Sequence, residues 1–275
     1  MKSLDSVIES FRIVLKNPKM MLVYFAYLLF ILFLIVFAVI FSIGVIPISS
    51  ITSYKTLLEY LESTSFLLII AIIAFFVIIV LFVSPIFTGM LLSMGIQAVK
   101  GKVSIEKAFN EAKKKYFSLL GVSLVNSTIF AFVGVLFLLL LFSLRGFSAL
   151  FSLFILVIGA VLIVAVFVIL GILFYEANTL VFTENKKAIE AIKRSIYIGN
   201  KKALSIFAII FFFGVINMGI GFVVAILHLP ISILGSLLLD LLFYIFIELP
   251  VNCFTSTVGN ILPVVFYYNY NLKKI

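Results

Sequence analysis

Long apolar runs make up most of the chain, and short polar breaks separate them. Five of these runs contain no Asp, Glu, Lys or Arg: residues 20–54, 63–99, 116–144, 146–175 and 203–239. Each is longer than the roughly 20 residues that a membrane-spanning helix needs. The runs lack the alternation of a membrane β-barrel, and a backbone inside lipid must satisfy its own hydrogen bonds. The pattern therefore predicts at least one transmembrane helix in every run.

The breaks inside and between the runs predict six transmembrane helices. Arg145 and Gly146 mark a short turn between the third and the fourth. Pro230, after Leu229, is expected to end the fifth helix and allow the reversal into the sixth, because proline lacks a backbone N–H. The expected fold class is all-α, a polytopic membrane helix bundle in a single domain over residues 1–275. The spans are placed near 21–46, 66–84, 117–142, 148–174, 203–227 and 231–249.

Three charged segments between the apolar runs resemble one another. They are "SLDSVIESFRIVLKNPK" from Ser3, "SIEKAFNEAKKKYFSLL" from Ser104 and "AIEAIKRSIYIGNKKAL" from Ala188. In each, apolar residues recur at helical spacing and the opposite face is charged, which predicts amphipathic helices in the membrane interface. Two spans follow each segment. We therefore expect three repeats of an amphipathic helix plus a helical hairpin, over residues 1–100, 101–184 and 185–275.

Composition and charge agree with a membrane protein. The chain is 65% hydrophobic and 11% charged, whereas soluble domains carry about 25% charged residues. Eighteen of the 20 Lys and Arg residues fall on one side of the predicted topology, and only Lys55 and Arg145 fall on the other. The positive-inside rule then places both termini in the cytoplasm of a cell membrane. The net charge of +9 therefore requires no nucleic acid as a partner.

The second span of each expected repeat runs on into a polar stripe. Pro85 and Pro250 are expected to break the helix in the first and third repeats, and Glu176 stands near the equivalent place in the second. Stripes at helical spacing could converge on a cytoplasm-facing cavity. The alternative is that small and hydroxylated residues let membrane helices pack closely. The candidate cavity residues are Glu176, Thr179, Thr183, Glu248, Asn252 and Ser256.

One acid, Asp240, falls inside a predicted span. If the sixth helix starts at residue 231, Asp240 lies about 14 Å along it, near the bilayer midplane. A charge there costs about 2.5–3.5 kcal/mol unless it is neutralised or hydrogen-bonded. The candidate polar partners at compatible depth are Asn126, Asn217 and Tyr244. Asp240 is then either a protonated tie between helices or a proton or ion site.

The sequence motifs of enzymes are missing. We find no Gly-rich phosphate loop and no nucleophile elbow. With Cys253 as the only cysteine and His228 as the only histidine, no Cys/His metal site can be assembled. We therefore expect no catalytic residues, no metal site and no cofactor, and we favour a protein that is not an enzyme.

Three segments carry a resemblance to a known group of proteins. The segment "SVIESFRIVLKNPKMML" precedes the first span, "AIEAIKRSIYIGNKKALSIF" precedes the fifth, and "PVVFYYNYNLKK" follows the sixth. Together they resemble uncharacterised six-helix integral membrane proteins of archaea and bacteria. These are distantly similar to the membrane domain attached to some glycerophosphodiester phosphodiesterases. The resemblance implies a helical membrane domain of unknown activity, without a phosphodiesterase domain or catalytic residues in this chain.

Two functions fit these observations. The first is a non-enzymatic membrane module that binds membrane lipids, including anionic headgroups, or a protein partner or second copy through its basic amphipathic helices. The second is a small transporter or channel that uses the polar stripes and Asp240. All three expected repeats begin on the same side of the membrane, unlike the inverted repeats of familiar transporters. This difference favours the membrane module.

Overall fold

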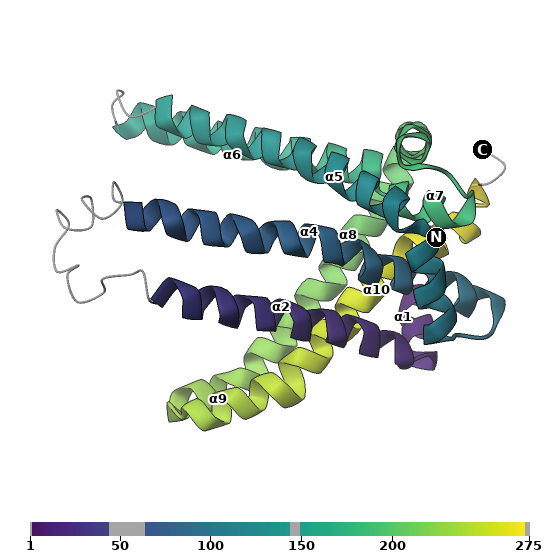
Figure 1. Ribbon diagram of the computed structural model, residues 1–275, viewed down its shortest axis with the longest axis horizontal. Coiled ribbons are helices and arrows are strands. Elements are labelled where there is room, and N and C mark those ends of the chain that lie inside the picture. Colours follow the sequence, from purple (N-terminus) through teal and green to yellow (C-terminus); the bar gives the residue numbers. More distant parts are fainter. Residues whose placement is uncertain (1, 44–63, 144–148, 273–275) are drawn as a thin grey trace.

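The computed structural model describes residues 2–43, 64–143 and 149–272, and these residues form helices without a strand (Figure 1). In chain order the elements are α1 (Lys2–Lys16), α2 (Lys19–Ile43), α4 (Thr64–Lys100), α5 (Ile105–Ser143), α6 (Ala149–Phe174), α7 (Ala177–Thr183), α8 (Ala188–Leu234), α9 (Leu237–Phe243), the π-helical segment η3 (Tyr244–Glu248) and α10 (Leu249–Asn269).

Six helical stretches in the described part of the chain are long and apolar enough to cross a membrane. They lie in α2, in α4, in α5, in the α6–α7 region, in α8 and in the continuous α9–η3–α10 stretch. The prediction of an all-α polytopic membrane bundle with six spans is therefore confirmed. The chain is a membrane protein.

The reversal between the last two spans lies further along the chain than the sequence predicted. Helix α8 contains Pro230 and continues to Leu234, so the expected turn at Leu229 and Pro230 is wrong. The chain reverses at Gly235, whose φ of 62° lies in the left-handed region. Glycine adopts this conformation without the steric cost of a Cβ atom.

The other two prolines behave differently from one another. Helix α4 runs through Pro85 for 37 residues, about 55 Å, so the expected break at Pro85 is wrong. Pro250 lies in the first turn of α10, directly after the π-helical segment. There the N–H of Leu249 bonds to the carbonyl of Tyr244, an i to i−5 pattern. In the second expected repeat the helix does break, between Phe174 and Ala177.

The three charged segments do not start their spans in the same way. Helix α1 ends at Lys16, just before Pro18, and a separate helix follows. Helix α5 begins inside its charged segment and continues directly into its span. Helix α8 also begins inside its charged segment, but a kink separates that segment from the span. Only Lys202 of α8 departs from helical φ and ψ there, at −123° and 21°. The interfacial amphipathic helices and the threefold repeat therefore both stay predictions.

Both ends of the described chain lie at one end of the bundle, which we call the termini end (Figure 1). Helices α1 and α7 and the short connection between α4 and α5 also lie there. Helices α2, α4, α5 and α6 project from it toward the opposite end, and the α8 to α10 pair crosses them obliquely. Lys55 and Arg145, which the sequence placed on the other side of the membrane, lie outside the described residues.

The buried core also lies toward the termini end. One cluster joins α1, α5, α7, α8 and α10 and includes the fully buried Leu180 and Phe266. A second joins α1, α2, α4, α5 and α10 and includes Met20 and Met94. Phe11 of α1 packs against both clusters. Helix α1 thus ties the two halves of the bundle together at this end.

The opposite halves of the spans expose their apolar side chains. Phe33 of α2, Phe75 of α4 and Leu162 of α6 are 57%, 59% and 60% exposed. In water such surfaces would be unfavourable, but lipid tails are as apolar as these side chains. The spans therefore present these surfaces to lipid and need close helix packing mainly near the termini end.

Candidate functional site

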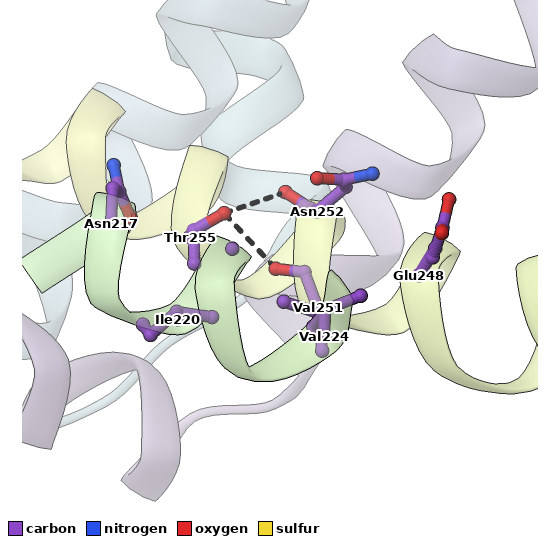
Figure 2. A pocket seen from close by; sticks show the side chains of 8 residues that line it. Asn217, Ile220, Val224, Glu248, Val251, Asn252 and Thr255 are labelled. Atoms are coloured by element: carbon purple, nitrogen blue, oxygen red, sulfur yellow. Dashed lines mark hydrogen bonds between the residues drawn. The ribbon is translucent and has the colours of Figure 1, made fainter. Parts of the chain in front are cut away.

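A polar groove lies between α8 and α10, which we call the α8–α10 groove (Figure 2). Its volume is about 400 Å³. Three polar side chains, those of Asn217, Glu248 and Asn252, lie along one edge in Figure 2, and apolar side chains form the floor. The full lining consists of Asn217, Ile220, Gly221, Val224, Glu248, Val251, Asn252 and Thr255.

Local backbone features create this groove. Glu248 is the last residue of the π-helical segment. The wider turn of a π-helix changes the direction of the side chains relative to a regular α-helix. Pro250 follows and has no N–H to donate to the preceding turn. On the facing helix, Gly221 contributes no side chain to fill the space. The groove therefore forms where neither helix packs tightly against the other.

The groove offers both hydrogen-bond acceptors and the amide N–H donors of its two asparagines. Asn217 Oδ1 is buried and has no hydrogen-bond partner. Thr255 donates its hydroxyl to the carbonyls of Val251 and Asn252, at 3.0 and 3.4 Å. Glu248 adds a carboxyl, and the lining contains no Lys, Arg, His or Cys. The groove can hold a polar guest, but it offers no nucleophile paired with a base.

A second polar cluster is enclosed in the core at the break between α6 and α7. It consists of Tyr175, Glu176, Asn178 and Thr179, and we call it the Glu176 cluster. Glu176 is 1% exposed and Thr179 is fully buried. Both Glu176 carboxyl oxygens lack a hydrogen-bond partner, as do Tyr175 Oη, Asn178 Oδ1 and Thr179 Oγ1. Native proteins pair nearly all such buried groups, so this cluster needs an explanation.

Helix α8 holds the backbone of this break in place. The Ser195 hydroxyl donates to the carbonyl of Leu173 at 2.7 Å and accepts from the N–H of Glu176 at 3.2 Å. One turn further along, a Cβ at Gly199 would lie 3.0 Å from the Leu173 Cα and the Ile172 carbonyl oxygen. The two helices therefore meet backbone to backbone, which only a small residue allows.

Asp240 has a partner that the sequence analysis did not consider. Its Oδ1 lies 3.0 Å from Nε2 of His228, on the fifth span. The His228 ring stacks on Phe243 at 4.8 Å, and Ser232 Oγ lies 3.3 Å from Nδ1. The side chains of His228 and Asp240 are 32% and 44% exposed. Asp240 therefore belongs to a pair near the α8–α9 turn.

The remaining candidates are scattered. Asn126 lies in a separate pocket of about 320 Å³ between α4 and α5, where its Oδ1 is buried and unpartnered. Tyr244 is 47% exposed. Thr183 donates to the Thr179 carbonyl at 3.0 Å, and the Ser256 carbonyl accepts from Asn260 at 2.9 Å. The expected polar site around Asp240 is thus divided among different helix pairs.

The candidate cavity also divides into two places. Glu248 and Asn252 line the α8–α10 groove together with Asn217, whereas Glu176 and Thr179 lie in the core. Sequence reasoning missed Ser195 and His228. Their signal was weak, because the serine is one of many small residues and the histidine was considered only as a metal ligand. No group of three His, Cys, Asp or Glu side chains comes together among the described residues.

Comparison with known proteins identifies the family. The model of the family described as Domain of unknown function (DUF7847) matches residues 1–270, and the chain belongs to this family. No curated protein and no solved structure matches the chain. The likeness to membrane domains of glycerophosphodiester phosphodiesterases therefore stays a prediction.

Proposed function

We propose that this member of the DUF7847 family is a non-enzymatic membrane module that binds anionic lipid headgroups at its termini end. The observation that carries the proposal is a set of exposed basic side chains without acidic partners. In the described part of the chain, Lys and Arg form ion pairs only through Lys186 and Arg194, both with Glu184. The exposed basic residues outside these pairs include Arg12, Lys16, Lys19, Lys107, Lys113, Lys114, Lys187 and Lys193.

These residues lie on or directly before four helices, α1, α2, α5 and α8, near the termini end of the bundle. Lys113 and Lys114 lie on the first turns of α5, and Lys187 and Lys193 lie at the start of α8. Near an anionic membrane surface each basic side chain contributes about 1 kcal/mol, and the effect fades beyond a Debye length of about 10 Å. Several such side chains at one surface favour anionic over neutral lipids.

The proposal includes an orientation and a location. The termini end faces the cytoplasm of the cell membrane, because Lys and Arg are retained on the cytoplasmic side during insertion. The cytoplasmic leaflet is also the one that carries anionic lipids. Charge thus both sets the topology and provides the binding surface.

The test is lipid binding by purified full-length protein. In native mass spectrometry at low salt, phosphatidylglycerol should bind at least about tenfold more tightly than phosphatidylcholine. Replacing Lys107, Lys113 and Lys114 with glutamine should weaken phosphatidylglycerol binding by at least about tenfold. The matched variant with arginine at these three positions keeps the charge and should bind like the wild type.

Two results would contradict the proposal. One is equal binding of phosphatidylglycerol and phosphatidylcholine by the wild type. The other is unchanged phosphatidylglycerol binding by the glutamine variant, which would assign these charges to topology alone.

A second candidate function, a small transporter or channel, is favoured by the α8–α10 groove. Asn217, Glu248 and Asn252 bring polar groups to a helix pair in the membrane-spanning region. A π-helical segment beside them is typical of functional sites. A flux of cations or small amines into liposomes, lost in the Glu248→Gln variant and kept in Glu190→Gln, would support transport over the membrane module.

A further inference from the structure

The Glu176 cluster concentrates an unusual number of unsatisfied buried groups in five consecutive residues. Its unpartnered atoms are Tyr175 Oη, both Glu176 carboxyl oxygens, Asn178 Oδ1 and Thr179 Oγ1. Each such group costs free energy when it loses water without gaining a partner. The surrounding side chains are those of the apolar core, including Leu180 and Phe266. Among the described residues, the neighbouring Thr179 hydroxyl is the one side-chain group placed to interact with the Glu176 carboxyl, so most of these oxygens stay without a protein partner.

Glu176 also lacks a counter-charge among the described residues. Arg194, which follows Lys193 at the start of α8, is engaged elsewhere. Its Nη2 donates to the Leu272 carbonyl at 3.2 Å, and its Nε lies 3.6 Å from Glu184. A buried carboxyl group in a protein is paired with a cationic side chain, bound to a metal ion or protonated. In this structure the first arrangement is absent for Glu176.

The groups around Glu176 are oxygen atoms of the kind that hard cations prefer. The Thr179 side chain lies beside the carboxyl, one helical turn along α7, and the Tyr175 hydroxyl is close enough to interact with it electrostatically. Helix α6 ends at Phe174, so the negative end of its dipole and its last carbonyl groups also point toward this break. The ends of broken helices coordinate alkali cations in several membrane transporters.

We propose that the break between α6 and α7 binds an alkali-metal cation, Na⁺ or K⁺, with Glu176 as the charged ligand and Thr179 as a neutral one. One carboxylate balances one positive charge, whereas Ca²⁺ sites usually combine several carboxylates. The cation satisfies several oxygen acceptors together, which a single added proton cannot do. The proposed entry is from the termini end, because α7 lies at that end of the bundle. This site is independent of lipid binding at the basic surface.

The test measures thermal unfolding of the purified full-length protein. It compares LiCl, NaCl, KCl and choline chloride at constant ionic strength. A bound cation stabilises only the folded state, so Na⁺ or K⁺ should raise Tm saturably, by about 5 °C over choline. Comparison of NaCl with KCl identifies the cation. The Glu176→Gln variant should lose the rise, and Thr179→Val should shift its midpoint to about tenfold higher cation concentration.

The matched control is Glu190→Gln, which removes an exposed carboxylate from the neighbouring helix and should keep the full response. Equal Tm values of the wild type in all four salts would overturn the proposal, as would a full cation response in Glu176→Gln. If Glu176→Gln does not fold, equilibrium binding of radioactive Na⁺ and Rb⁺ to the wild type tests the proposed cation site instead. Saturable binding that Thr179→Val weakens supports the site, and its absence overturns it.

Discussion

His228 and Asp240 face each other across the turn between α8 and α9, with Nε2 and Oδ1 3.0 Å apart. Because the chain reverses at Gly235, Asp240 lies about 8 Å beyond the turn along the helix, not the expected 14 Å. The partner of Asp240 is therefore a histidine, which was not among the expected partners Asn126, Asn217 and Tyr244. The pair ties the two helices of the last hairpin together near its tip.

The first prediction separates hydrogen bonding from charge at this pair. Asp240→Asn keeps an acceptor for His228 and should leave Tm nearly unchanged. Asp240→Leu removes the acceptor and should lower the free energy of unfolding by about 0.5–1 kcal/mol, because both side chains are partly exposed. His228→Leu should cost a similar amount. The double variant with leucine at both positions should lose less than the two single variants combined, and strict additivity would show that the pair contributes no coupling.

The second prediction concerns the close crossing of α6 and α8. Alanine at Gly199 would place a Cβ 3.0 Å from the backbone of Leu173, which cannot move aside cheaply. We expect Gly199→Ala to destabilise the protein by about 1–3 kcal/mol. At Gly214, on the same helix, a Cβ would meet no atom within 4 Å. Gly214→Ala should therefore be neutral or stabilising, and equal Tm losses in the two variants would refute the close approach.

The third prediction concerns how α1 is held at the termini end. Asn269 of α10 donates to Glu9 Oε2 at 2.8 Å and to Ser6 Oγ at 3.1 Å. Asn269→Leu removes both bonds and should release α1, so that trypsin cleaves after Lys16 several times faster. Asn260→Leu is the control, because Asn260 bonds within its own helix to the Ser256 carbonyl. Unchanged cleavage in Asn269→Leu would mean that the core contacts of α1 alone hold it.

The number and class of the helices could be predicted because they depend on apolar length. A bilayer requires about 20 apolar residues for each span, and each run exceeds this length. The ends of the helices were harder to predict. Pro85 and Pro230 are tolerated inside α4 and α8, because neighbouring groups in membrane bundles satisfy the carbonyls that a proline leaves unpaired. The true turn depended on Gly235, whose left-handed conformation gives no apolar signal.

The candidate residues could be selected from the sequence, but their grouping could not. Glu176 and Glu248 are both acidic residues next to apolar stretches of the sequence. In the structure Glu176 lies in the Glu176 cluster and Glu248 lines the α8–α10 groove. Which cluster each belongs to depends on where the helices cross. Ser195 shows this well, because its role comes from contact with Leu173 and Glu176 at a crossing that no spacing in the sequence reveals. Asn217 was matched to Asp240 by depth but lies beside Glu248 in the groove.

The last prediction tests the orientation on which the lipid proposal depends. Single cysteines that replace Lys55 and Asn110 probe the two sides of the membrane. Lys55 lies outside the described residues, and Asn110 is an exposed residue of α5 near the termini end. In intact cells a membrane-impermeant maleimide should label position 55 and spare position 110, because the basic termini end stays in the cytoplasm. Both positions should react after permeabilisation. Cys253 is 3% exposed, so the parent chain gives a low background. Labelling of position 110 but not 55 in intact cells would place the basic surface outside, away from the anionic leaflet, and would remove the basis for lipid binding there.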